Sequence, residues 1–129
     1  MSRTVLPTPA ELQILDVLWE HGPSTVRQVN ERMRGNGADV GYSTTLKLMQ
    51  IMFDKELLHR DESVRPQIYR ATRSREATER QLLRDVRDRA FGGSLRRLVL
   101  RALDMESLGP DEKRRIEAML ERASKGSRS

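Results

Sequence analysis

The chain has 129 residues, of which 36% are hydrophobic, 4% aromatic and 33% charged. This composition argues against a large monomeric core and favours one small domain, or two half-sized pieces that need a partner. The lack of cysteine excludes disulfides and thiolate metal sites, and two distant histidines are a weak basis for any metal site, so we expect no metal and no other cofactor. No leader-like or membrane-spanning apolar run is found, so we expect a cytoplasmic protein without membrane insertion.

The net charge of +5 is unevenly distributed. Residues 1–72 contain nine Lys/Arg and nine Asp/Glu, whereas residues 73–129 contain fifteen and ten. Net charge alone therefore does not locate a nucleic-acid surface. From Val40 to Phe53, however, Lys47 and the phenol of Tyr42 are the only ionisable groups, so no carboxylate there repels a phosphate.

The first predicted helix covers about residues 9–21. Thr8-Pro9-Ala10-Glu11 has the pattern of a capping box with proline at the first helical position. Large apolar residues then recur at helical spacing up to His21-Gly22-Pro23, which ends the helix. Trp19 is expected to anchor the core.

The second predicted helix follows Ser24, its expected N-cap, and ends at Gly35-Asn36-Gly37. Ser24 and Arg27 are candidate phosphate contacts at the start of this helix. The alternative for Arg27 is an ion pair with Glu31, four residues further on. The side chains expected to face inward are Val26, Val29 and Met33.

The third predicted helix, from Tyr42-Ser43 to about Glu56, has the pattern of a DNA recognition helix. Its start is rich in hydroxyl groups, which can bind phosphates beside the free backbone N–H groups of a first turn. The candidate DNA contacts in this turn are Tyr42, Ser43 and Thr44. The side chains expected to face the core are Thr45, Leu48, Met49, Met52 and Phe53. The opposite stripe consists of Ser43, Lys47, Gln50 and Asp54.

Individual roles follow from these positions. Ser43 and Thr44 are either phosphate or base contacts or helix caps. Lys47 is expected to contact DNA because it stands alone on the exposed stripe. An exposed Leu46 could touch a thymine methyl group, and Gln50 could read an adenine.

Two short segments of alternating character within residues 57–72 predict a β-hairpin. Three helices followed by such a hairpin make a winged helix-turn-helix, in which the hairpin tip can lie over the DNA backbone. Arg60 and Arg65 are candidate contacts on this wing, with ion pairs to Asp61 and Glu62 as the alternative. Arg65 is favoured because it lies at the presumed tip.

The second half of the chain predicts three amphipathic helices whose apolar stripes are too short to form a core alone. We therefore predict a helical homodimerisation region. The apolar side chains expected at the dimer interface are Leu83, Val86, Phe91, Leu95, Leu98, Val99, Ile116 and Leu120. The predicted organisation is a mainly α fold with a small β-hairpin wing: a winged helix-turn-helix domain (1–72), a dimerisation domain (73–124) and a disordered tail (125–129).

Catalysis is not expected, because neither histidine has a glycine-rich elbow or a phosphate loop beside it. The residues favour a DNA-binding transcriptional repressor. Two alternatives stay open: a winged-helix adaptor for protein contacts, and a regulator that senses a small ligand between its domains. Salt-insensitive binding would favour the adaptor, and ligand-dependent thermal stability would favour the sensor.

Several short motifs follow one another in a fixed order. They are Leu15 to Trp19, Thr25-Val26-Arg27-Gln28-Val29, Gly41-Tyr42-Ser43-Thr44-Thr45, Lys55-Glu56-Leu57-Leu58-His59-Arg60, Tyr69, and Ala90-Phe91-Gly92-Gly93-Ser94-Leu95 with Leu98-Val99-Leu100. This order resembles the penicillinase-repressor family of transcriptional regulators (BlaI/MecI type) over nearly the whole chain. The resemblance implies a cytoplasmic homodimer that binds a palindromic operator in double-stranded DNA and blocks transcription. In the antibiotic-resistance branch it also implies release through a membrane sensor and peptidase.

Two departures from the family's pattern concern this release. The resistance repressors are cleaved at an Asn-Phe pair after the Leu-Val-Leu run, whereas this chain has Arg101-Ala102 in that cleavage region. This difference argues against cleavage by the same peptidase. The copper-responsive branch carries C-terminal cysteines, which this chain lacks. The inducing signal is therefore not predicted.

Overall fold

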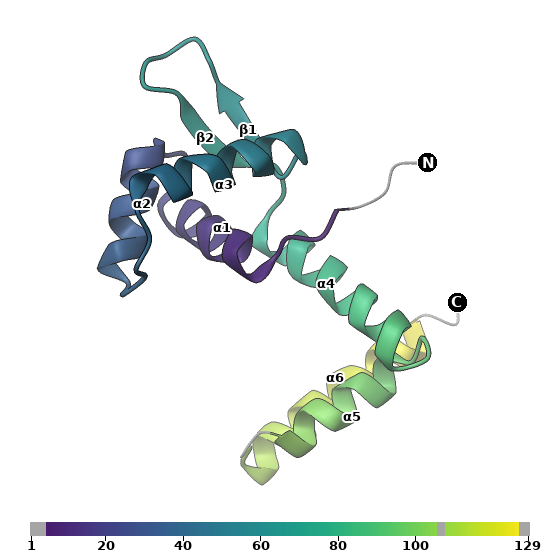
Figure 1. The fold of residues 1–129 in the computed structure, drawn as a ribbon. Helices are drawn as coiled ribbons and strands as arrows, with labels where there is room; N and C mark the ends of the chain where they lie inside the picture. Colours follow the sequence, from purple (N-terminus) through teal and green to yellow (C-terminus); the bar gives the residue numbers. More distant parts are fainter. Residues whose placement is uncertain (1–4, 106–107, 127–129) are drawn as a thin grey trace. The chain divides into compact units, whose positions relative to one another are not determined.

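The computed structural model of the protein describes residues 5–105 and 108–126, with side chains up to residue 122. In chain order the elements are α1 (Pro9–His21), α2 (Val26–Gly35), α3 (Tyr42–Asp54), β1 (Leu58–Asp61), β2 (Ile68–Ala71), α4 (Arg75–Ala90), α5 (Leu95–Met105) and α6 (Pro110–Gly126). This mainly helical arrangement with one small hairpin confirms the predicted fold class (Figure 1). The chain divides into two compact units, residues 1–82 and 83–129.

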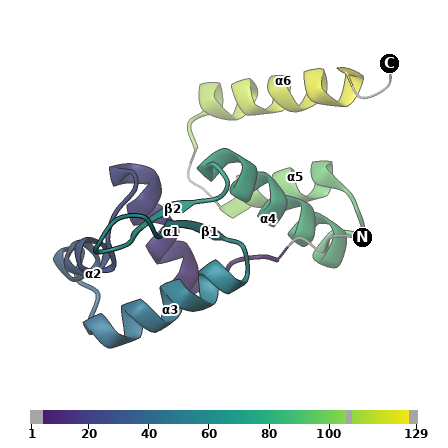
Figure 2. The same ribbon diagram turned by 90° about the horizontal axis from the view of Figure 1, so that it is seen from above.

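The first unit has the three helices and the wing of a winged helix-turn-helix. Helices α1, α2 and α3 pack together with the hairpin beside them (Figures 1 and 2). They enclose one apolar core, to which each strand of the hairpin contributes a buried residue. The strands pair antiparallel, with Leu58 opposite Ala71 and Arg60 opposite Tyr69. The buried core residues are Ile14, Leu15, Val17, Leu18, Val26, Val29, Met33, Met49, Met52, Leu58 and Tyr69.

The first two helices begin at capping boxes. The Thr8 hydroxyl accepts a hydrogen bond from the Glu11 N–H (3.2 Å), and the Glu11 carboxylate accepts one from the Thr8 N–H (2.9 Å), as predicted. The cap of α2 is Thr25, however, so the predicted Ser24 cap is wrong. Ser24 instead exchanges two backbone hydrogen bonds with Tyr69 of the wing, which holds it in an extended bridge outside the helix.

Helix α3 ends in a Schellman motif whose left-handed residue is not glycine. The Leu57 N–H donates to the Met52 carbonyl (2.9 Å), and Glu56 has a φ of 65°. Because a Cβ is strained in this conformation, we expect Glu56→Gly to raise the free energy of unfolding by about 0.5–1 kcal/mol in urea denaturation. Gln50→Gly, at an exposed position inside the same helix, should lower it by about 1 kcal/mol. Destabilisation by both changes would contradict strain at Glu56.

The first unit extends beyond the limit predicted at residues 72/73. The half-buried Trp19 donates from Nε1 to the Arg73 carbonyl (2.9 Å), and the Arg75 guanidinium carbon lies 5.5 Å from its ring centroid. Thr78 in α4 is buried. These contacts explain why the start of α4 belongs to the first unit and why the division falls at residues 82/83.

The second unit leaves many apolar side chains exposed. The Ser94 hydroxyl caps α5 by accepting from the Arg97 N–H (3.1 Å), and Gly92 and Gly93 separate α4 from α5 with positive φ values, as the sequence predicted. The large hydrophobic side chains that are exposed here include Leu83, Val86, Leu95, Leu100, Met105 and Met119. Of the predicted tail, residues 125 and 126 lie in α6, and 127–129 lie outside the described residues.

Candidate nucleic-acid interface

The start of α3 lacks the side-chain caps that close α1 and α2. Its N-cap is Gly41, and no side chain accepts a hydrogen bond from the first turn among the residues the structure describes. Ser43 and Thr44 are exposed, so their alternative role as caps is not realised. The free N–H groups and the two hydroxyls are therefore placed to bind one phosphate together.

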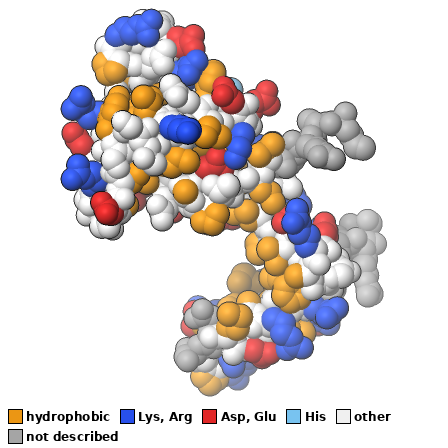
Figure 3. Space-filling model, in the orientation of Figure 1, with side chains coloured by type: hydrophobic (Ala, Val, Ile, Leu, Met, Phe, Trp, Pro, Cys, Tyr) orange, Lys and Arg blue, Asp and Glu red, His pale blue; other side chains and the backbone are white. Residues whose placement is uncertain are grey.

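The outer face of α3 is polar and almost uncharged. Ser43, Lys47 and Gln50 are all exposed, as predicted, and few charged groups lie along the visible side of this helix (Figure 3). Within the described ranges Lys47 forms no ion pair, which leaves its ammonium available to an outside partner. Leu46 is half buried against the core, so the prediction of an exposed Leu46 is wrong. The apolar stripe of α3 is wide enough to include it.

Two buried polar residues hold α3 against α2. Asn30 Nδ2 donates to Thr45 Oγ1 (2.9 Å) and to the Val40 carbonyl (3.0 Å), and the Thr45 hydroxyl donates to the Gly41 carbonyl (3.1 Å). Thr45 is fully buried, which confirms its predicted structural role. Asn30 was not singled out from the sequence, since its partners are set by the tertiary fold. Leaving such buried groups unpaired costs about 1–3 kcal/mol, so they fix one arrangement of the two helices.

Arg27 at the start of α2 lies beside Tyr42 at the start of α3. The guanidinium carbon is 5.8 Å from the ring centroid, a cation–π distance, and both side chains are exposed. The alternative ion pair between Arg27 and Glu31 is not found in the described part of the chain. Arg27 and Tyr42 border a pocket of about 300 Å³ whose wall also includes Leu46 and Gln67. The starts of α2 and α3 and the wing therefore line the same pocket.

The acidic groups of the wing are already engaged. The Asp61 carboxylate accepts hydrogen bonds from the hydroxyl and the N–H of Ser63, and these bonds lower the pKa of Asp61. Glu62 accepts from Nε of Arg60 (2.9 Å). Arg65 is exposed in the loop between β1 and β2 and has no ion pair within the described residues. Its charge is therefore free to meet a phosphate.

Two residues predicted to contact DNA are not presented to solvent in the expected way. Ser24 is buried in its bridge to the wing. Arg60 lies on the side of β1 that faces α3, with its guanidinium carbon 3.8 Å from the ring centroid of Phe53. The sequence did not reveal these positions because both depend on contacts made after folding.

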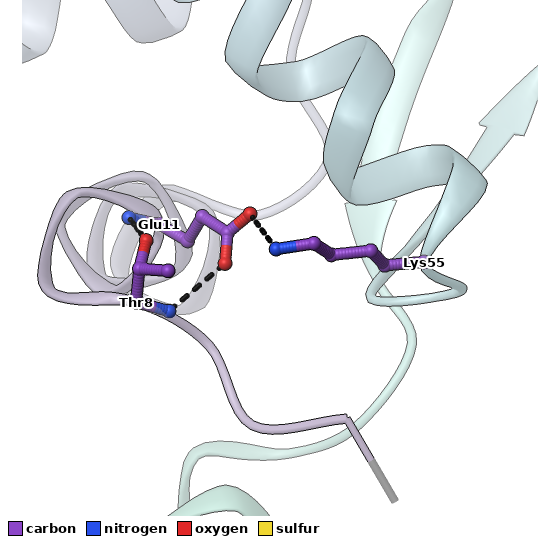
Figure 4. Close-up of polar contacts among 3 residues, drawn as sticks. All are labelled: Thr8, Glu11 and Lys55. Atoms are coloured by element: carbon purple, nitrogen blue, oxygen red, sulfur yellow. Dashed lines mark hydrogen bonds and ion pairs between the residues drawn. The ribbon is translucent and has the colours of Figure 1, made fainter. Parts of the chain in front are cut away.

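An ion pair between a half-buried lysine and a buried carboxylate fixes the other end of α3. Lys55, which directly follows the helix, donates to the Glu11 carboxylate (2.9 Å), and Glu11 is 2% exposed (Figure 4). Burial by itself would raise the pKa of Glu11. The hydrogen bond from the Thr8 N–H and the ion pair with Lys55 outweigh that effect and hold the pKa below its ordinary value of 4.5. This carboxylate therefore joins the start of α1 to the end of α3.

The residues predicted for dimerisation all lie in the second unit or at its edge. Those exposed in the single chain are Leu83, Val86 and Leu95. Those half buried are Phe91, Leu98, Val99, Ile116 and Leu120. Arg101 and Ala102, the predicted cleavage region, are exposed on α5.

Known proteins support the same fold and family. A MarR family protein from Bacillus stearothermophilus has a similar structure, with a TM-score of 0.50 and 22% sequence identity over 95% of this chain and 76% of that chain. No curated protein matches the chain. No helix in the described ranges is both long and apolar enough to cross a bilayer. The family model described as penicillinase repressor matches residues 7–122, most of the winged helix and the helices after it. The chain therefore belongs to the penicillinase repressor family and is a DNA-binding transcriptional regulator.

Proposed function

We propose that the protein is a repressor that binds a palindromic operator as a homodimer, with one α3 helix in the major groove at each half-site. The observation that carries this proposal is the outer face of α3. It combines an uncapped first turn, exposed hydroxyls, no carboxylate in the helix before Asp54, and a Lys47 that forms no ion pair with any residue the structure describes. Such a face suits a polyanion such as DNA. It would oppose an acidic protein surface only weakly, and for that reason the test must use DNA itself.

The side chains divide into two kinds of contact. Ser43, Thr44 and the free N–H groups of the first turn are proposed to hold a backbone phosphate. Lys47 and Gln50, further along the exposed face, are proposed to reach base edges. The remaining proposed backbone contacts are Arg27 and Tyr42 at the helix starts and Arg65 on the wing.

The second copy is proposed to cover the eight side chains of the second unit that the sequence predicts for dimerisation, a set that does not include Met105. Exposed hydrophobic groups are visible there (Figure 3). Leu83 and Val86, on successive turns of α4, are both exposed. Burial of each large apolar side chain contributes about 1.5–3 kcal/mol. We expect Leu83→Asp to weaken dimerisation at least tenfold in sedimentation velocity, because a charge would be buried without a partner.

The matched control is Met105→Asp, which introduces the same charge at an exposed apolar residue outside the proposed interface. It should leave the sedimentation coefficient unchanged. A wild-type chain that sediments as a monomer at micromolar concentration would contradict the dimer, and so would equal effects of the two substitutions.

Two mechanisms are considered for release of the repressor from DNA: proteolysis and binding of a small ligand. Arg101 and Ala102 lie inside α5, so a protease would have to unfold that helix locally before cutting there. A pocket of about 700 Å³ in the first unit supports small-ligand sensing as a second candidate. It lies at the end of α3 and is lined in part by Leu15, Phe53 and Thr78. If a screen of metabolites finds one that raises the melting temperature of the protein, that result would favour this route.

Selection of bound sequences from a random duplex pool, repeated at two salt concentrations, tests the proposed function. The dimeric repressor predicts an enriched inverted repeat whose affinity falls as salt rises. No enrichment with a folded, dimeric protein would support the adaptor alternative instead.

A further inference from the structure

Arg60 is held by groups from three parts of the first unit. Its guanidinium carbon stacks 3.8 Å from the ring centroid of Phe53, in the last turn of α3. Its Nε donates to Glu62 in the hairpin loop (2.9 Å). Tyr69 lies directly opposite on β2, and hydrogen bonds with Tyr69 and then Glu62 raise the pKa of Arg60. The side chain is only 21% exposed.

The wing needs such an attachment because it is small. Each strand has four residues, and a two-stranded hairpin by itself is marginally stable in water. Leu58 fastens the base of the hairpin to the core, and Tyr69 fastens β2 to it at the level of Arg60. Arg60 is the next inward-facing residue of β1 toward the tip, since side chains alternate along a strand.

We propose that Arg60 is a positioning residue that locks the wing to the end of the recognition helix and does not itself contact DNA. Arg60, Phe53 and Glu62 form what we call the wing clasp. Because Glu62 is occupied by Arg60, its charge does not repel the DNA backbone, and Arg65 at the tip is held within reach of a phosphate. The DNA part of this inference rests on the proposed function; the attachment of the wing does not.

The test compares Phe53→Leu, Arg60→Gln and the double variant in the full-length chain. The first change removes the ring without altering any charge, and the second removes the stacked cation. The DNA probe is the inverted-repeat duplex enriched from the random pool, measured over a range of salt. Amide hydrogen exchange of residues 58–71, without DNA, reports directly on the wing. Arg75→Gln is the matched control, because Arg75 also stacks on a ring, that of Trp19, away from the wing.

The wing clasp predicts that either single change weakens binding about fivefold and speeds exchange in the wing, while exchange in α1 is unchanged. The double variant should lose little more than either single one, because both remove the same contact. Arg75→Gln should leave wing exchange as in the wild type.

Two outcomes would overturn the proposal. The first is a double variant whose losses add, together with a salt slope that Arg60→Gln alone reduces by about one unit per subunit, since that is the signature of a phosphate contact. The second is unchanged exchange in the wing of both single variants. A wild-type protein that binds no duplex would count against the proposed function, whereas the exchange data would still decide whether the wing clasp exists.

Discussion

Lys47→Met is expected to weaken binding of the homodimer to its inverted repeat about 30-fold. The duplex meets two copies of Lys47, and each lost contact should cost about 1 kcal/mol. If the ammonium meets a phosphate, the salt dependence should also fall by about one charge per subunit; if it reads a base, the preference at that base pair should relax. Fluorescence anisotropy over a range of salt, with the selected duplex and its single-base variants, distinguishes the two.

Arg34→Met provides the control for charge alone. Arg34 is exposed in the last turn of α2, away from the uncapped start of α3, so its loss should change affinity less than about threefold. Equal losses for Arg34→Met and Lys47→Met would mean that only the overall charge matters. That result would remove Lys47 from the interface.

The same replacement at Lys55 is expected to affect stability instead. Lys55→Met leaves the Glu11 carboxylate buried without its ion-pair partner, and we expect the free energy of unfolding at neutral pH to fall by about 2 kcal/mol. Urea denaturation measures this loss. Lys47→Met, an identical change at an exposed residue without an ion pair in the described ranges, should stay within about 0.5 kcal/mol of the wild type.

The loss should depend on pH in a defined direction. The pKa of Glu11 is lower in the folded protein than its ordinary value of 4.5, so the stabilisation is complete above that value and disappears as pH falls through the folded pKa. The gap between wild type and Lys55→Met should therefore shrink on acidification to about pH 3. A gap that is constant with pH would contradict a role for the Glu11 charge.

Local signals in the sequence predicted most of the fold. Capping boxes, glycines with positive φ and helical spacing of apolar residues act within a few residues, so Thr8-Pro9-Ala10-Glu11 and Gly92-Gly93 marked helix ends correctly. The prediction of the α2 cap was wrong because Ser24 and Thr25 both carry a hydroxyl that can cap a helix. A backbone bridge from Tyr69, 45 residues away, decides between them.

The candidate interface was predicted less completely than the fold. Periodicity placed Lys47 and Gln50 on the exposed face, because exposure on a helix follows from spacing. It did not reveal that Arg60 faces Phe53 or that Asn30 binds Thr45. These contacts join elements through tertiary packing, and charge or polarity in the sequence does not distinguish them from solvent-exposed groups.

The central claim is that α3 is the recognition helix. Cleavage of DNA by a reagent attached to a single residue of the protein tests this claim most directly. The chain has no cysteine, so Gln50→Cys gives one attachment point for an iron chelate that releases hydroxyl radicals, with exposed Gln13→Cys on α1 as the control. If α3 lies in the major groove of each half-site, the Gln50 conjugate should cut at two positions related by the symmetry of the repeat, and the Gln13 conjugate should not. Tight binding without such cuts from Gln50, or equal cuts from both conjugates, would contradict α3 as the recognition helix.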